Sequence, residues 1–177
     1  MKQLFFISAL VLSFIFMSGT AAQAQHYNTE GGIRWMNWEQ VQKALKKEKK
    51  PVISDVYTTW CYWCKVMDKK TFTDQSIIDY INNNFYAVKF DAEHKEPILF
   101  KGNKYTYYGS GRRGANRLAI ELLQNQLSFP TILYLDPDLN TILISPGYKT
   151  PKMLKKEMKF VKTGAYKTTP WNKYSGE

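Results

Sequence analysis

The sequence predicts an α/β fold in which a mixed central sheet is flanked by helices. Residues 52–57 and 85–91 have the apolar, β-branched character of strands, and they alternate with amphipathic helical stretches, as parallel strands joined by helices do. Residues 131–135 and 141–145, separated by the turn Asp136–Asn140, instead predict a hairpin of antiparallel strands. We therefore expect one mixed sheet of about five strands.

The first residues carry the pattern of a secretory signal, which we assign to residues 1–24. Lys2 precedes an apolar run from Leu4 to Met17, and Ala22-Gln23-Ala24 offers a small-residue cleavage site. The apolar run is too short to span a bilayer comfortably, so we expect cleavage and export, not a membrane anchor. The mature protein is expected to lie outside the cytoplasm, in the periplasm of a bacterium.

The 177-residue chain has a formal net charge of +10 at pH 7 and two cysteines. Without the signal its length suits a single domain, and two cysteines are too few for a disulfide-stapled scaffold. Its basic residues are spread over several stretches, and the expected address argues against nucleic acid, so we interpret them as solvated helix faces. We expect no nucleic-acid partner and no membrane-spanning segment.

Residues 25–32 are interpreted as a polar leader, and the domain is predicted over residues 33–162. Its first helix begins after Asn37, because this side chain can cap the helix while Gln40 reaches back to it. The lysine-rich stretch that follows brings the helix to an end before Pro51.

The strand at residues 52–57 leads through a tight loop into a helix that is expected to reach Lys70. Thr73 is predicted to cap a further helix, which is followed by the second strand at residues 85–91. Residues 92–113 are rich in Lys, Gly and Tyr and show no sustained period, which predicts a long functional or mobile loop.

The last third of the chain is predicted to hold a helix, the hairpin and a closing helix. Residues 115–126 have a clear amphipathic pattern. Thr150 caps the closing helix, which has a proline at its first turn and runs to about Lys162. Residues 163–177 are interpreted as a C-terminal tail.

Cys61 and Cys64 lie three positions apart at the predicted start of a helix. The helix N-terminus would stabilise a thiolate at the first cysteine, and the second lies within bonding reach one turn on, so the pair predicts a reversible disulfide. A zinc half-site has this spacing but would need further ligands, for which only His26 and His94 are available. A structural staple over so short a loop would add little stability. We expect no metal and no cofactor.

This order of elements around Trp60-Cys61-Tyr62-Trp63-Cys64 resembles the thioredoxin family over residues 33–162. Residues 50–57, followed by Trp60-Cys61 and Lys70-Thr71-Phe72, are most similar to the C-terminal thioredoxin domain of DsbD-type thiol:disulfide interchange proteins and their small exported relatives. The resemblance implies a thioredoxin-like α/β fold with an insertion, about residues 92–113, before the cis-proline. The chain departs from thioredoxin in that insertion and in Tyr62-Trp63, which replaces Gly-Pro.

The resemblance also implies roles for individual residues. Cys61 would be the attacking thiolate, which needs an exposed sulfur, and Cys64 the resolving thiol that releases the substrate. Asp55 lies at the family's spacing before Cys61 and would be the buried acid that accepts the proton of Cys64. If Asp55 is buried, its pKa should be raised; the alternative is an ordinary polar residue near the end of a strand.

The remaining assignments from the resemblance surround the disulfide. Trp60 is expected to pack beside it, and Pro130 takes the place of the cis-proline. Lys89 matches a lysine near the buried acid, with a solvated charge at the sheet edge as the alternative. Substrate contacts are predicted for Tyr62, Trp63 and Phe129.

The predicted function is an exported thiol:disulfide oxidoreductase that reduces protein disulfides through Cys61 and Cys64. Because its compartment is oxidising, a membrane thiol reductase would have to supply electrons. The alternatives are a disulfide oxidase or isomerase, a non-catalytic metal carrier, and a binding module in which the redox pair is incidental. In the insertion, aromatic and basic residues occur together and could either bind a partner or cover the edge of the active site. These residues are Tyr105, Tyr107, Tyr108, Arg112 and Arg113.

Overall fold

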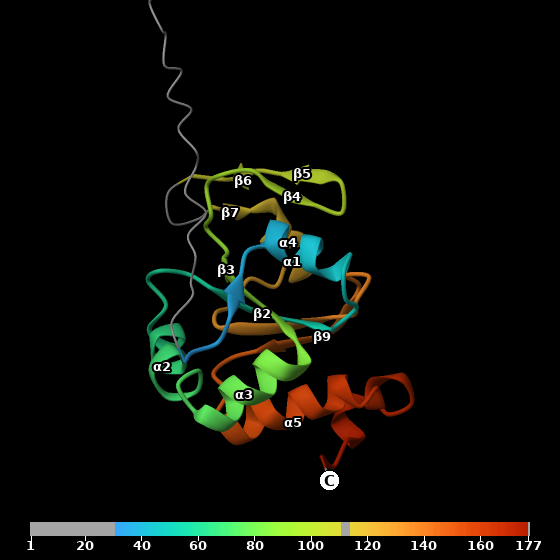
Figure 1. The fold of residues 1–177 in the computed structure, drawn as a ribbon. Coiled ribbons are helices and arrows are strands. Elements are labelled where there is room, and N and C mark those ends of the chain that lie inside the picture. Colours follow the sequence, from blue (N-terminus) through green and yellow to red (C-terminus); the bar gives the residue numbers. More distant parts are fainter. Residues whose placement is uncertain (1–30, 111–113, 177) are drawn as a thin grey trace, which may run out of the picture.

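A mixed sheet of five strands, in the order β1-β3-β2-β8-β9, lies at the centre of the fold (Figure 1). The structure is a computed structural model that describes residues 31–110 and 114–176. The predictions for the signal, for most of the leader and for Arg112 and Arg113 fall outside the described residues. The sheet and its flanking helices confirm the predicted α/β class.

The five strands of the central sheet are β1 (Trp35–Met36), β2 (Val52–Tyr57), β3 (Tyr86–Asp91), β8 (Thr131–Leu135) and β9 (Thr141–Pro146). β2 pairs in parallel with β3 on one side and antiparallel with β8 on the other. All its residues before Tyr57 are buried, as its continuous apolar character predicted. β8 and β9 form the predicted hairpin.

The α-helices of the described chain are α1 (Trp38–Leu45), α2 (Tyr62–Lys70), α3 (Gln75–Asn84), α4 (Arg117–Leu122) and α5 (Pro151–Lys162). α1 and α4 cover one face of the sheet, and α3 and α5 cover the other (Figure 1). Val56 of β2 belongs to the apolar cluster under α1 and α4, and Ile53 to the cluster under α3 and α5. None of the helices in the described ranges is long and apolar enough to cross a membrane.

Asn37 caps α1 in the predicted way. Its Oδ1 accepts the backbone N–H of Gln40 at 2.8 Å, and Gln40 Oε1 accepts the backbone N–H of Asn37 at 2.9 Å. Two backbone donors that no turn of the helix can satisfy therefore have partners.

Asn37→Ala is expected to lower the free energy of unfolding by about 1 kcal/mol, because it leaves a helix donor unsatisfied. Urea denaturation followed by circular dichroism measures this change. Asn172→Ala, which alters an exposed asparagine near the C-terminus, is the control and should change stability by less than about 0.5 kcal/mol. Equal losses in the two variants would count against the capping role.

The prediction that Thr73 caps the helix after α2 is wrong, because Asp74 caps α3. Asp74 Oδ1 accepts the backbone N–H of Ile77 at 3.2 Å. The Thr73 hydroxyl instead donates to the carbonyl oxygen of Lys69 at 2.8 Å and so closes the end of α2. Adjacent threonine and aspartate are both good caps, and the sequence alone did not separate them.

The predicted helix over residues 115–126 is too long, because α4 has only the six residues Arg117–Leu122. Asn116 begins the helix by accepting the backbone N–H of Leu118 at 3.0 Å. Gln124 and Asn125 have φ angles of 53° and 64°, which a right-handed helix does not allow. The apolar positions expected on this helix are nevertheless buried.

The predicted irregular loop at residues 92–113 is also wrong, because it contains strands. β4 (Ile98–Phe100) pairs with β5 (Asn103–Tyr105), and β6 (Tyr107–Tyr108) pairs with β7 (Ala115–Asn116). Strands of two or three residues are too short to show a period. The insertion packs on the domain, since Phe100 lies edge-on to Trp38 at 5.1 Å and the Tyr105 hydroxyl donates to Glu121 at 2.8 Å.

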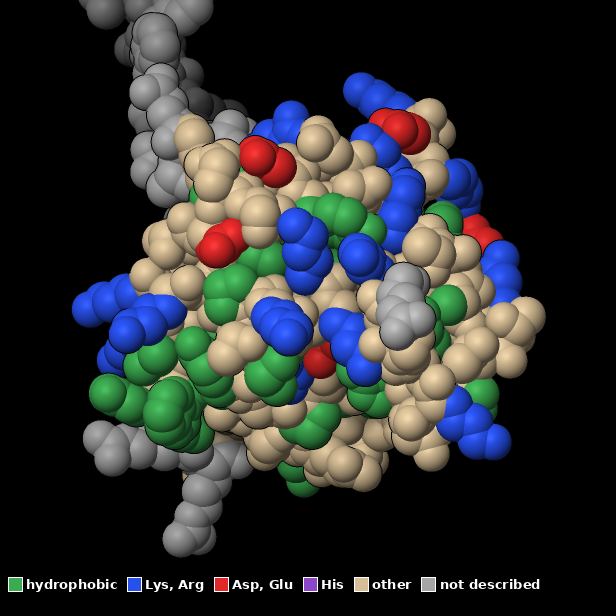
Figure 2. Space-filling view, turned by 90° about the horizontal axis from the view of Figure 1, so that it is seen from below, with side chains coloured by type: hydrophobic (Ala, Val, Ile, Leu, Met, Phe, Trp, Pro, Cys, Tyr) green, Lys and Arg blue, Asp and Glu red, His purple; other side chains and the backbone are tan. Residues whose placement is uncertain are grey.

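The end of the chain folds back on α5. It contains two 3-10 turns, η2 (Ala165–Lys167) and η3 (Trp171–Lys173). The ring of Phe160 on α5 lies 6.4 Å from that of Tyr166, 5.2 Å from that of Trp171 and 5.0 Å from that of Tyr174. Figure 2 shows this side of the molecule, where Lys and Arg side chains outnumber acidic ones.

Candidate redox site

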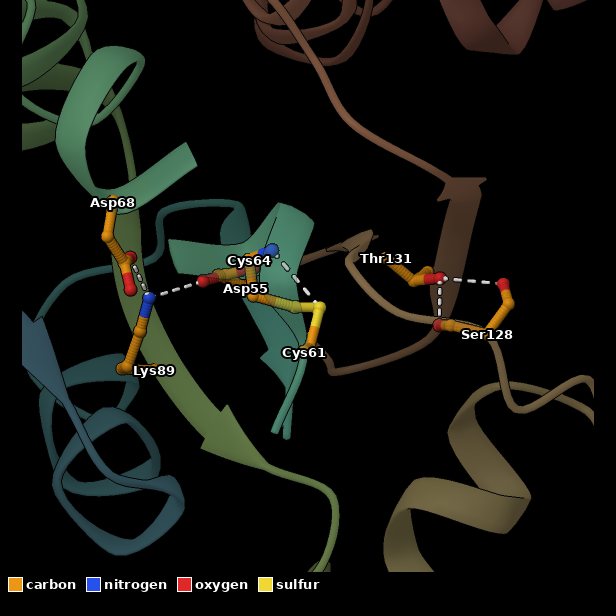
Figure 3. The surroundings of a disulfide bond; sticks show 7 residues. All are labelled: Asp55, Cys61, Cys64, Asp68, Lys89, Ser128 and Thr131. Carbon is orange, nitrogen blue, oxygen red and sulfur yellow. Dashed lines mark hydrogen bonds and ion pairs between the residues drawn. A yellow bond between two sulfur atoms is a disulfide. The ribbon is translucent and has the colours of Figure 1, made fainter. Parts of the chain in front are cut away.

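Cys61 and Cys64 form a disulfide at the N-terminus of α2 (Figure 3), with their Cα atoms 5.3 Å apart. Cys61 is the N-cap residue of α2, and its Sγ accepts the backbone N–H of Cys64 at 3.1 Å. The pair follows the carboxyl end of β2, the edge where open α/β sheets place their sites. After reduction, the same N–H and the helix dipole would stabilise a thiolate at Cys61.

The expectation that the attacking sulfur is exposed is wrong for the disulfide form. Cys61 is 4% exposed and Cys64 is 1% exposed. The Cys61 sulfur is turned back onto the first turn of α2, where it bonds to Cys64 and accepts its N–H. Cys61 is still the more exposed member of the pair.

Asp55 lies on the central strand β2 and is fully buried. Burial raises the pKa of its carboxyl group, although the charge of Lys89 and the hydrogen bond from it act to lower that pKa. Oδ2 accepts a hydrogen bond from Lys89 Nζ at 2.5 Å, and Oδ1 has no hydrogen-bond partner among the described residues. In the view of Figure 3, Asp55 lies between Lys89 and the disulfide. Asp55 is therefore a buried carboxyl group within the sheet and not a solvated side chain.

Lys89 on β3 connects Asp55 to α2. Its ammonium group forms ion pairs with Asp55 and with Asp68. Burial acts to lower the pKa of Lys89, but the two carboxylates raise it above its usual value. The side chain is 9% exposed, so Lys89 is not a solvated charge at the sheet edge. Its ammonium lies within 5.4 Å of three ring centroids, those of Trp35, Tyr57 and Phe72.

Asp68 was missed by reasoning from the sequence. It follows Cys64 by four positions on α2, which places the two residues on neighbouring turns of one helix face. That spacing is a signal that could have found it, but its partner Lys89 comes 21 residues later on another element. Figure 3 shows the pair of carboxylates on either side of the lysine ammonium.

The Phe129–Pro130 peptide bond is cis and immediately precedes β8. Residues on both sides hold this turn, because the Thr131 hydroxyl donates to the carbonyl oxygen of Ser128 at 2.8 Å and the two hydroxyl oxygens lie 3.4 Å apart. In Figure 3 this pair and the Lys89 ammonium lie on opposite sides of the disulfide.

Aromatic side chains surround the disulfide on the surface. Trp60 lies edge-on to Phe129 with 6.0 Å between their ring centroids, and the ring centroids of Tyr62 and Trp63 are 5.4 Å apart. Tyr62 is 70% exposed, and Trp60 and Trp63 are also exposed. Tyr148 completes the cluster, 5.5 Å from Trp63. Tyr148 comes from the loop after β9, and nothing near it in the sequence predicted this contact.

The donors that a metal site would need were also located. His94 lies in the loop after β3, where its backbone N–H donates to Asp91, while His26 is outside the described ranges. Both cysteine sulfurs are held in the disulfide. In residues 31–110 and 114–176, no group of three or more His, Cys, Asp or Glu side chains is placed to hold a metal ion.

Known proteins resemble this chain in sequence and in fold. The family Thioredox_DsbH, described as "Protein of unknown function, DUF255", matches residues 22–174. "Uncharacterized protein B0495.5" of Caenorhabditis elegans is 31% identical over 120 residues, which are 67% of this chain and 14% of that protein. The thiol:disulfide interchange protein DsbD of Campylobacter jejuni is 34% identical over 68 residues, which are 38% of this chain and 12% of DsbD.

The solved structure of a DsbH oxidoreductase superposes on this chain with a TM-score of 0.53 at 15% sequence identity. The superposition covers 78% of this chain and 87% of that one, which shows the thioredoxin fold. The chain thus shares its fold with DsbH, while it spans only 14% and 12% of the two sequence relatives.

Proposed function

We propose, on the premise that this chain belongs to the Thioredox_DsbH family, that it reduces disulfide bonds of other proteins outside the cytoplasm. The thioredoxin fold and the Cys61–Cys64 disulfide make it a thiol:disulfide oxidoreductase. The reductive direction, the export and the protein substrates are the proposed part. The observation that carries the proposal is the Cys61–Cys64 disulfide at a helix N-terminus, together with the buried carboxyl group of Asp55, whose pKa is raised.

The reaction would start from the dithiol form. The Cys61 thiolate attacks one sulfur of a substrate disulfide, so that the substrate S–S bond breaks, one substrate thiolate leaves and a mixed disulfide forms. Cys64 then loses its proton and attacks the Cys61 sulfur. This step forms the intramolecular disulfide of the present structure and releases the second substrate thiolate. Two electrons pass from the protein to the substrate.

Asp55 is the proposed acceptor of the Cys64 proton. A carboxyl group with a raised pKa is a better base near neutrality than an ordinary aspartate, because its conjugate acid is weaker. Its Oδ2 is held by Lys89, whereas Oδ1 makes no hydrogen bond within the described part of the chain. The contact of Lys89 with the half-exposed Asp68 connects the buried acid to the surface of α2, where a proton can be exchanged with water.

The charges of the site support the reductive direction. A thiol:disulfide oxidoreductase is a strong oxidant when its dithiol form is stabilised relative to its disulfide form. Positive charge next to the thiolate provides such stabilisation. Here the positive charge of Lys89 is offset by Asp55 and Asp68, so this cluster adds no net positive charge. The N-terminus of α2 is then the main stabilising feature for the thiolate.

The equilibrium reduction potential against glutathione tests the direction. We expect a value close to that of thioredoxin, about −270 mV, because no excess positive charge stabilises the dithiol form. A value close to that of DsbA, about −120 mV, would assign the protein to oxidation instead. In an oxidising compartment a reductase of this potential would depend on a membrane thiol reductase as its electron donor.

The aromatic cluster is proposed to bind the substrate polypeptide. Trp63→Ala is expected to lower kcat/KM for a protein disulfide by about tenfold, because exposed tryptophans are frequent binding hot spots. The rate with a small aromatic disulfide reagent should change little. Leu99→Ala is the control, since Leu99 is an exposed apolar residue that belongs to neither of the two aromatic clusters considered for binding. A loss of the same size with both disulfides would point to an effect on Cys61 instead of on binding.

A further inference from the structure

Lysine side chains form a continuous stripe along the outer side of α5. Leu154, Met158 and Val161 are buried on the inner side of this helix. The lysines recur at intervals of three and four positions, which places them together on the opposite side. We define the α5 face by seven lysines: Lys152, Lys155, Lys156, Lys159, Lys162, Lys167 and Lys173.

The charges of the α5 face are only partly offset within the described structure, because Asp74 at the start of α3 interacts with the charge of Lys155 but forms no ion pair with it. No carboxylate of the described residues lies within 4.0 Å of any of these seven ammonium groups. Glu157, the one acid of α5, points into the core, where Ser145 donates to it at 2.7 Å and Tyr134 at 3.2 Å. Asp74 and Asp79 of the neighbouring α3 are too few to balance seven lysines. Figure 2 shows this side with many Lys and Arg side chains and few acidic ones.

Amphipathic aromatic residues lie among these lysines. The Lys156 ammonium is 5.5 Å from the ring centroid of Trp171 and 5.9 Å from that of Tyr174. Both rings pack on Phe160 and remain partly exposed. Tryptophan and tyrosine prefer the level of lipid headgroups, where one end of the side chain is apolar and the other is hydrated.

We propose that the α5 face binds the surface of an anionic lipid bilayer. Each basic residue near such a surface adds attraction, and the five lysines that share the outer side of α5 act together. The apolar side of α5 is occupied by the core, so the contact is peripheral and electrostatic and α5 does not insert.

The composition of the α5 face favours lipid over nucleic acid. All seven cations are lysines, whereas arginine provides the planar fork that binds phosphate groups of nucleic acids in two places at once. Exposed Met153 and the rings of Trp171 and Tyr174 suit the boundary between headgroups and acyl chains. The disulfide lies at the N-terminus of α2, a different helix from the one that carries the α5 face (Figure 1).

Sedimentation with vesicles tests this proposal on the chain of residues 25–177. We expect binding to phosphatidylcholine vesicles that contain about one third phosphatidylglycerol, and none to pure phosphatidylcholine, because the attraction needs anionic lipid. Binding should be lost at high salt, which screens exposed charges. Binding to a DNA duplex without binding to these vesicles would overturn the proposal in favour of nucleic acid, and binding to neither would overturn it outright.

Two matched triple variants locate the surface. Lys152→Glu/Lys159→Glu/Lys162→Glu should weaken vesicle binding by at least about 100-fold, because roughly fivefold is lost for each lysine and the three added glutamates are repelled by the anionic surface as well. Lys46→Glu/Lys47→Glu/Lys104→Glu makes the same change in net charge, but on residues at the end of α1 and in the insertion. Its vesicle binding should be much closer to that of the original chain than the binding of the first variant. Equal losses would mean that only net charge matters and would overturn the α5 face. Both variants should keep their rate of disulfide reduction, so the result is independent of the proposed redox function.

Discussion

Cys61→Ser is expected to abolish the reduction of protein disulfides, because the attacking thiolate is then absent. Cys64→Ser should also stop turnover, but for a different reason: attack still occurs and the resolving thiol is missing. The substrate then stays bound to Cys61. Insulin reduction measures turnover, and non-reducing electrophoresis of the variants with a disulfide substrate reveals the mixed disulfide.

The two serine variants control each other, because they make the same chemical change at neighbouring positions. A mixed disulfide in Cys64→Ser and none in Cys61→Ser would support the assigned order of attack. A mixed disulfide in Cys61→Ser alone would reverse the roles of the two cysteines. The first result is the expected one, because Cys61 is the N-cap residue of α2, where the helix N-terminus stabilises a thiolate.

Asp55→Asn should slow the release of substrate from the mixed disulfide by about 100-fold at neutral pH, the usual contribution of a general base. In the original protein the rate of substrate release should rise with pH as Asp55 loses its proton. This rise should occur at a higher pH than the titration of an ordinary aspartate, because burial raises the pKa of Asp55. In the variant the rise should move to still higher pH, because Cys64 must then lose its proton without a carboxylate to accept it. Stopped-flow measurement of release from a preformed mixed disulfide gives both profiles.

Asp68→Asn is the control for this experiment. It keeps Asp55 but removes a negative charge that helps to raise the pKa of Asp55, so the pH rise should shift to lower pH. Attack by Cys61 on the substrate should be little affected in either variant. An unchanged pH profile in Asp55→Asn would show that Asp55 does not accept the proton.

Local sequence patterns predicted the elements that depend on neighbouring residues. The capping pair Asn37 and Gln40, the buried strand at residues 52–57 and the hairpin after Pro130 all follow from short-range signals, and the structure has each of them. The insertion at residues 92–113 was misjudged because its strands have only two or three residues and gain order from packing on α1. Tertiary contacts of this kind leave no periodic trace in a sequence.

The site was predictable where its residues share one short segment. Cys61 and Cys64 stand out by spacing alone, whereas Asp55 and Lys89 depended on a family resemblance. Asp68 and Tyr148 were missed because their partners come from other elements. Burial of Cys61 was also missed, since it depends on how the sulfur turns back on α2 after the bond forms.

The position of β2 between β3 and β8 has a consequence for how the chain folds. Val52 pairs with Leu135, so a nascent chain that ends at α4 leaves one edge of β2 without backbone partners. The core cannot close until the last third of the polypeptide has been synthesised, because β8 belongs to that part of the chain. Pairing between strands so far apart in the sequence is also slow to form. Under the export proposed above, a polypeptide that is still open at this stage would be threaded through a secretion channel and would complete its fold on the far side.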